Sequence, residues 1–104
     1  MADNIRIRIT LKGGVADVKA LMTHPMETGL RKDPISGELV PLHFIQKVQA
    51  THNGKVVLEA QWSQAVSKNP FIHFRVKDAK PGDKIVIAWE DTRGEHNGID
   101  ATIP

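Results

Sequence analysis

Strict alternation of apolar and polar side chains is the feature that most limits the fold of this chain. In residues 4–12, isoleucine or leucine occupies every second position, and arginine, threonine or lysine follows each of them. Successive side chains of a β-strand point to opposite faces, so this segment predicts a strand with one buried and one solvated face. The same period of two recurs in residues 71–78 and 84–92.

Turn sequences divide the remaining chain into short segments. Asn53-Gly54 favours the positive φ angles of a type I′ hairpin turn between strands at 43–52 and 55–63, with Val56, Leu58, Ala60 and Trp62 facing inward. Residues 80–83 predict another turn, and Asn97-Gly98 is expected to introduce a last strand over 99–103. Residues 15–24 fit either a strand or a helix.

About seven short strands without a convincing helix indicate an all-β fold, an immunoglobulin-like antiparallel β-sandwich. A length of 104 residues corresponds to one domain, here residues 1–104. The 14 Lys and Arg and 12 Asp and Glu residues are mixed along the chain without a basic block, so neither nucleic acid nor a membrane surface is an expected partner. Residues 1–4 show no leader pattern, which alone predicts the cytoplasm.

Catalytic and cofactor-binding patterns are absent from the sequence. With no cysteine, the chain has no disulfide, thiolate metal site or cysteine nucleophile. No nucleophile elbow or glycine-rich phosphate loop occurs, and Glu90 and Asp91 are expected on opposite faces of a strand. We therefore expect no enzymatic activity and no cofactor.

One soft-metal motif gives an alternative function. Met22, His24 and Met26 offer two thioethers and an imidazole, which are ligands that suit Cu(I). Met22 also lies in an apolar segment, where methionine commonly fills gaps in a core. The alternative is a periplasmic Cu(I)-binding immunoglobulin-like module, whereas most of the other histidines are expected at the surface.

Apolar residues at positions assigned to solvent predict a partner surface. Val57, Phe71 and Val86 break the polar alternation of their strands, and Ile45 follows core-type Phe44 in the opposite direction. Residues 25–41, rich in Pro, Gly and charge, predict one long loop, and such loops are often functional. The candidate partner contacts are Met26, Leu30, Arg31, Val57 and Phe71.

Several segments resemble the SoxZ family, the smaller subunits of the SoxYZ carriers of thiosulfate oxidation. Residues 24–33 read HPMETGLRKD and are similar to a signature of that family. The segments PLHFI, NGK, WSQAVSKNPF, PGD and WED follow in the family's order at 41–45, 53–55, 62–71, 81–83 and 89–91. The resemblance covers nearly the whole chain.

This resemblance implies a non-catalytic subunit with an immunoglobulin-like fold. In the family, a cysteine near the C-terminus of the other subunit, SoxY, carries the sulfur substrate covalently. The heterodimer visits periplasmic enzymes of the SoxAX, SoxB and SoxCD types in turn. The resemblance further implies a periplasmic location reached by export with a signal-bearing partner, and it assigns no catalytic residue to this subunit.

Overall fold

The computed structural model describes residues 5–63, 65–66 and 68–104, and the described residues form seven strands and no helix. Residues 1–4, on which the expectation about a leader rests, lie outside the described residues. The strands are β1 (Ile5–Lys12), β2 (Val15–Met22), β3 (Ile45–His52), β4 (Lys55–Gln61), β5 (Phe71–Val76), β6 (Lys84–Asp91) and β7 (His96–Thr102). None of the described residues belongs to a helix long and apolar enough to cross a membrane.

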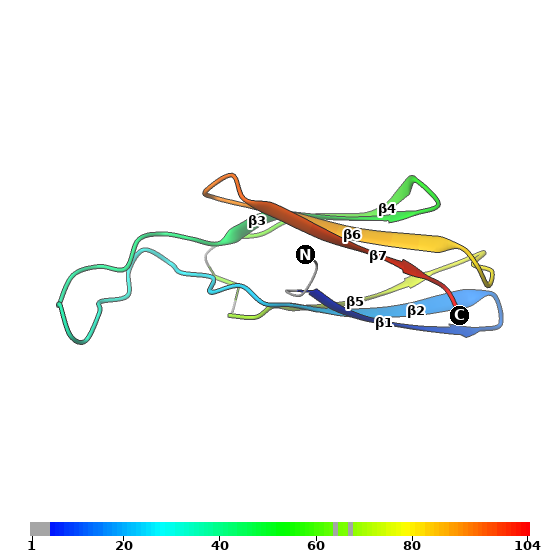
Figure 1. The fold of residues 1–104 in the computed structure, drawn as a ribbon, viewed down its shortest axis with the longest axis horizontal. Helices are drawn as coiled ribbons and strands as arrows, with labels where there is room; N and C mark the ends of the chain where they lie inside the picture. The colour runs from blue at the N-terminus through cyan, green and yellow to red at the C-terminus, as the bar shows by residue number, and fades with distance from the viewer. Residues whose placement is uncertain (1–4, 64, 67) are drawn as a thin grey trace.

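Two antiparallel sheets pack face to face (Figure 1). One has the strand order β1-β2-β5 and the other β4-β3-β6-β7. The predicted all-β fold, an immunoglobulin-like antiparallel sandwich of about seven strands, is thereby confirmed. The segment that fitted both periods is strand β2, which pairs with β1 and β5 and buries Val18 and Met22.

The core lies between the sheets and follows the predicted alternation. Ile85, Ile87 and Trp89 of β6 are buried, as are Val48 and Ala50 of β3. Burial of apolar side chains contributes about 25 cal/mol per Å² of surface removed from water, so these inward faces hold the sheets together. Asn53 (φ 50°) and Gly54 (φ 85°) form the predicted turn between β3 and β4.

Two irregularities in β3 and β4 correct the predicted facing of single residues. The pairing of β3 with β4 shifts between Ala50 and Thr51, which leaves Val57 as an extra residue in β4. Val56, predicted to face inward, therefore lies beyond the bulge and is 48% exposed. A similar shift at the start of β3 places Ile45 in the core, so the prediction of an outward Ile45 is wrong.

The last strand also begins earlier than predicted. Asn97 and Gly98 lie within β7 instead of preceding it, and Gly98 pairs with Ala88. The turn before β7 is formed by residues 92–94, where Gly94 has φ 78°. Because this turn already reverses the chain, the Asn-Gly pair can continue in extended backbone.

Candidate functional site

A long segment between β2 and β3 projects from one end of the sandwich. This finger, residues 23–44, extends well past the strands and lies along the molecule's longest dimension of 53 Å (Figure 1). Its two arms pair through backbone bridges at Glu27–His43 and Lys32–Leu39. The predicted loop is therefore an ordered, hairpin-like projection whose arms are joined by backbone hydrogen bonds, such as that from Val40 N–H to the Arg31 carbonyl.

Residues of the HPMETGLRKD segment give the finger its shape. The Arg31 guanidinium donates to both carboxylate oxygens of Glu27, at 2.9 Å from Nε and 2.6 Å from Nη2. These hydrogen bonds lower the pKa of Glu27 and raise that of Arg31. Gly29 has φ 83°, a left-handed conformation that favours glycine. A Cβ atom at this position would lie 3.3 Å from Leu42 Cβ.

The finger exposes large apolar side chains that its own fold does not use. Leu30 is 78% exposed and Ile35 is 97% exposed, and neither belongs to the buried core cluster or to the residues packed against it. Leu39 and Leu42, on the returning arm, are also exposed. Several exposed apolar residues on one ordered projection are typical of a partner-binding surface.

Both ends of the finger meet a buried carboxylate at the end of β6. We call His24, His43 and Asp91 the base cluster. Asp91 Oδ2 lies 3.1 Å from His24 Nε2 and 2.7 Å from His43 Nε2. Since His24 lies near the start of the finger and His43 near its end, one carboxylate fixes the two arms where they leave the sandwich.

The other oxygen of Asp91 holds the turn before β7. Oδ1 accepts hydrogen bonds from the backbone N–H groups of Arg93, at 2.9 Å, and Glu95, at 3.0 Å. Complete burial opposes the charge on Asp91, but the bonds from the two histidines and two amides outweigh it and lower its pKa below the ordinary value. Asp91 is thus an ionised carboxylate that four donors satisfy.

The hydrogen bonds of His24 argue against metal chemistry at the base cluster. The three side chains could approach one ion, because their ligand atoms lie within 4.8 Å of one another. However, His24 Nδ1 accepts the Met26 backbone N–H at 3.1 Å, so its Nε2 carries the proton donated to Asp91. Both ring nitrogens of His24 are engaged in hydrogen bonds, so His24 has no free lone pair for a metal ion. The cluster also offers no nucleophile.

The same contacts argue against the predicted copper motif. Met22 is fully buried in the core, as the packing interpretation of that residue predicted. The Met26 thioether accepts the Ile45 backbone N–H at 3.3 Å, and Met26 is only 5% exposed. Met22, His24 and Met26 are therefore packing and hydrogen-bonding residues, and the geometry favours no Cu(I) site.

The predicted partner contacts do not gather on one surface. Leu30 and Arg31 lie on the finger, whereas burial of Met26 removes it from any free surface. Phe71 is 58% exposed on the outer face of the three-stranded sheet, as expected for the isolated chain. Val57 lies on the other sheet, next to the β3–β4 turn, so one flat contact cannot include both Val57 and Phe71.

Phe71 adjoins the base of the finger. It pairs with Leu21 of β2, which is also exposed, and the two residues form an apolar corner. The preceding Pro70 accepts the Met22 N–H at 2.9 Å, and Asn69 exchanges hydrogen bonds with the backbone of His24. The apolar corner and the finger therefore belong to the same end of the molecule.

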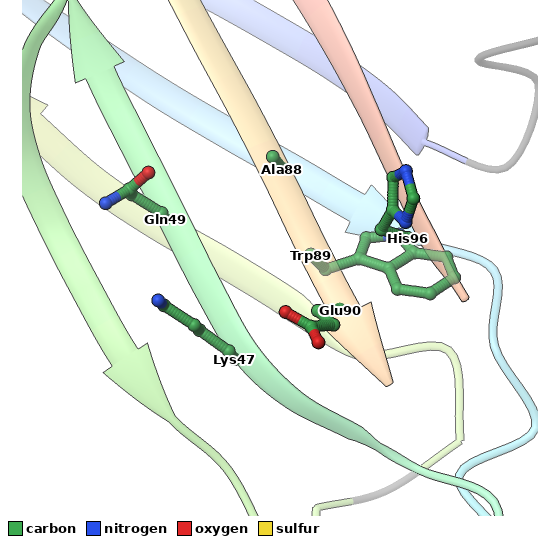
Figure 2. Close-up of a pocket in the computed structure, with 6 residues that line it drawn as sticks. All are labelled: Lys47, Gln49, Ala88, Trp89, Glu90 and His96. Carbon is green, nitrogen blue, oxygen red and sulfur yellow. The ribbon is translucent and has the colours of Figure 1, made fainter. Parts of the chain in front are cut away.

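A small hollow on the outer face of the four-stranded sheet is too small for an ordinary ligand pocket. Figure 2 shows Lys47, Gln49 and Glu90 around Ala88, with His96 beside them. Its volume is about 180 Å³, below the roughly 300 Å³ at which ligand pockets usually begin. Trp89 turns away from it into the core, where its ring contacts His24 edge to face, with centroids 5.1 Å apart.

Sequence reasoning missed the base cluster and misplaced several histidines. Besides His24, the side chains of His43 and His52 are mostly buried, so the expectation of surface histidines fails for them. Asp91 and Glu90 do face opposite sides of β6, as predicted. The separation of 48 residues between His43 and Asp91, and of 67 between His24 and Asp91, leaves no local pattern to find.

The fold and this site define a class: a small immunoglobulin-like sandwich with a projecting, apolar-tipped finger and no cysteine. Solved structures with this fold include a superoxide reductase from Nanoarchaeum equitans, 15% identical with a TM-score of 0.65, covering 98% of this chain and 93% of that one. The superoxide reductase (neelaredoxin) from Archaeoglobus fulgidus in the reduced form is 19% identical with a TM-score of 0.63, covering 95% and 85%. The hypothetical protein PH1083 from Pyrococcus horikoshii OT3 is 15% identical with a TM-score of 0.67, covering 96% and 87%. Identities this low show the shared fold alone.

A comparison with curated proteins found no match. The family model described as sulphur oxidation protein SoxZ matches residues 5–102. The chain therefore belongs to the SoxZ family and is a subunit of a sulfur-oxidation system.

Proposed function

We propose that this chain is the non-catalytic subunit of a SoxYZ-type sulfur carrier and binds a SoxY-type subunit as a heterodimer. The carrier subunit supplies the C-terminal cysteine that holds the sulfur intermediates, and this chain supplies the scaffold. The observation that carries the proposal is the ordered finger, because it exposes Leu30, within the family-like segment 24–33, and Ile35, just beyond that segment, outside the core. Permanent interfaces are more apolar than ordinary surface and use buried aromatic and arginine anchors.

The interface proposed here covers the finger and the apolar corner. Leu30, Arg31 and Ile35 come from the finger, and Leu21 and Phe71 from the neighbouring end of the three-stranded sheet. The bonds between the finger's arms and at its base order these residues before the partner arrives, which lowers the entropic cost of binding. Val57 is left out because it lies on the other sheet.

The lack of cysteine fits a supporting role. An accessible thiolate on this subunit could attack a persulfide or thiosulfonate on the carrier and trap it as a mixed disulfide. A chain with no cysteine cannot compete in this way. We further propose that the heterodimer works in the periplasm after export with a signal-bearing partner, and that SoxAX-, SoxB- and SoxCD-type enzymes visit it transiently.

The test compares three single variants in titration calorimetry against the purified carrier subunit. Ile35→Asp and Phe71→Asp should each weaken the complex by about 2 kcal/mol or more, roughly 30-fold in Kd, as hot-spot changes do. Both should keep the wild-type circular dichroism spectrum and unfold cooperatively, because both side chains are exposed. Val57→Asp is the control on the other sheet and should bind like the wild type.

The opposite pattern would move the interface. Loss of binding in Val57→Asp, with unchanged affinity in Ile35→Asp and Phe71→Asp, would place the carrier on the four-stranded sheet. Unfolding of Phe71→Asp, with unchanged affinity per folded molecule, would make Phe71 a core residue.

A further inference from the structure

The outer face of the three-stranded sheet gathers most of the excess positive charge of the molecule. Its exposed cations come from alternate positions of all three strands: Arg6, Arg8, Lys12, Lys19 and Arg75. Among the described residues of this face, Asp17 is the only carboxylate, so these five cations and one acid give it a net charge of +4. Since the whole chain carries +2, the remainder is net negative. We call this surface the basic face.

Asp17, the carboxylate of the basic face, does not neutralise the cations of β1. Its Oδ1 lies 2.7 Å from His73 Nε2 and 3.2 Å from Arg75 Nε, and these bonds lower the pKa of Asp17. Within the described part of the chain, Arg6, Arg8 and Lys12 take part in no ion pair. The carboxylate is thus already engaged on its own sheet, and the cations remain available to an external acid.

The register of β1 and β2 places like charges side by side. Arg8 is the direct cross-strand partner of Lys19, an arrangement that destabilises a sheet on its own. Arg6 and Arg8 also lie on the same side of β1, about 7 Å apart, which is within the screening length of about 8 Å at physiological salt, and Lys12 lies four residues further along that side. The monomer gains nothing from this arrangement, whereas an acidic partner would relieve the repulsion.

The basic face differs in chemistry from the finger. It is flat and charged, with hollows of about 310 and 460 Å³ that are open to solvent between its side chains. Charged surfaces of this kind accelerate association and favour short-lived complexes, while apolar projections suit permanent ones. A carrier that must bind several enzymes and leave each of them needs a charged surface for these short-lived contacts, besides an apolar surface for its permanent partner.

We propose that the basic face is the docking surface for acidic surfaces on the sulfur-oxidation enzymes that act on the carrier. This inference rests on the proposed carrier function and adds the chemistry by which the visiting enzymes are recognised. The cations steer the heterodimer to an enzyme, and because these contacts are exposed to solvent and screened by salt, the complex is short-lived. The finger and the apolar corner, which lies at the Arg6–Leu21 end of the same outer face, hold the permanent partner throughout, and the cations further along β1 and β2 meet the visiting enzyme.

The test uses the purified heterodimer with sulfur-loaded carrier and measures kcat and KM of the purified SoxB- and SoxAX-type enzymes. Raising NaCl from about 20 to about 300 mM should lower wild-type kcat/KM at least about tenfold, because steering is screened. The variant Arg8→Glu, Lys12→Glu, Lys19→Glu should lose about tenfold in kcat/KM at low salt and much of the salt dependence. Its kcat at saturation should be unchanged, since none of these residues meets the reacting sulfur.

The matched control is Lys47→Glu, Lys55→Glu, Lys84→Glu, which removes the same charge from exposed lysines of the four-stranded sheet. It should stay within about threefold of the wild type, as expected when net charge alone changes far from the docking surface. Equal effects of the two triple variants, or no effect of the first, would overturn the basic face as a docking surface.

Two further measurements separate the possible failures. Calorimetry of each triple variant with the carrier subunit should give the wild-type Kd; if the wild-type chain itself does not bind the carrier, the proposed function fails first. Binding to anionic phospholipid vesicles or duplex DNA that only the basic-face variant loses, with unchanged enzyme kinetics, would assign the surface to a polyanion and refute the enzyme as its partner.

Discussion

At the scale of single residues, Asp91 has the most demanding environment in the described structure. It is fully buried, and its four hydrogen bonds come from two side chains and two amides in three segments of the chain. A buried carboxylate is tolerated only when such donors compensate for lost hydration. The cluster resembles a catalytic or metal site in composition, but its hydrogen bonds assign it to structure.

Replacing Asp91 by Asn should destabilise the fold by about 3 to 5 kcal/mol. The amide NH₂ group would have to face either the two histidines or the two backbone N–H groups, and these are themselves donors. Urea unfolding at neutral pH measures this change. The control Glu90→Gln, on the exposed face of the same strand, should stay within about 0.5 kcal/mol. A loss below about 1 kcal/mol in Asp91→Asn would contradict the base cluster as the support of the finger.

At the scale of elements, the turn from β5 to β6 is tied to the β3–β4 hairpin by one carboxylate. Asp83 Oδ2 lies 2.8 Å from His52 Nε2 at the end of β3 and 2.9 Å from the Lys80 backbone N. The His52 bond, with help from Asn53 and Lys80, lowers the pKa of Asp83 to about 2.

This shift predicts a pH-dependent effect of Asp83→Asn. A carboxylate whose pKa is lower in the folded state stabilises the fold above its ordinary pKa, and this contribution is lost as the pH falls from about 4 to about 2. The Tm of Asp83→Asn should therefore lie below wild type at pH 7 and converge with it near pH 2. Asp100→Asn, an exposed control, should show no such convergence. A Tm difference that is the same at both pH values would show that Asp83 acts only through hydrogen bonds insensitive to its charge.

Period-two alternation predicted the strands well, because each has one face in the core. It failed where two residues of one strand oppose one of the other, as at Val57, and where His43 leaves the strand to pair with Glu27. Bulges and bridges depend on the partner strand, which the local sequence does not contain. The finger's location was predictable from its composition, whereas its order was not, since Asp91 closes it from 48 and 67 residues away.

At the scale of the whole molecule, charge that is dispersed in sequence is concentrated in space. Arg6, Arg8 and Lys12 alternate with apolar residues, so no basic block appears in the sequence. The β1-β2 pairing adds Lys19 to the same side, and the basic face results. Counting charges along a chain therefore misses a patch that strand alternation builds. The patch is flat, as a protein partner requires.

The absence of thiols makes a prediction about the intact subunit. After incubation of the heterodimer with thiosulfate and the oxidising enzymes, intact-mass spectrometry should show this chain at its unmodified mass, while the carrier subunit gains sulfur. Covalent carriage needs a thiolate, and the sequence has none. A stable sulfur adduct on this chain would disprove its supporting role.

The base cluster also sets when the finger can form. Its histidines lie in the first half of the chain and Asp91 near the end, so the finger's arms are fixed only after β6 has joined the sheet. Contacts of such high sequence separation form late, because the entropy of closing a long loop is lost before the contacts stabilise the chain. A chain still being synthesised, or one that has lost its last strands, would not display the finger in its binding shape. Recognition by the carrier subunit would thus select chains that have finished folding, and assembly would act as a check on the integrity of the scaffold.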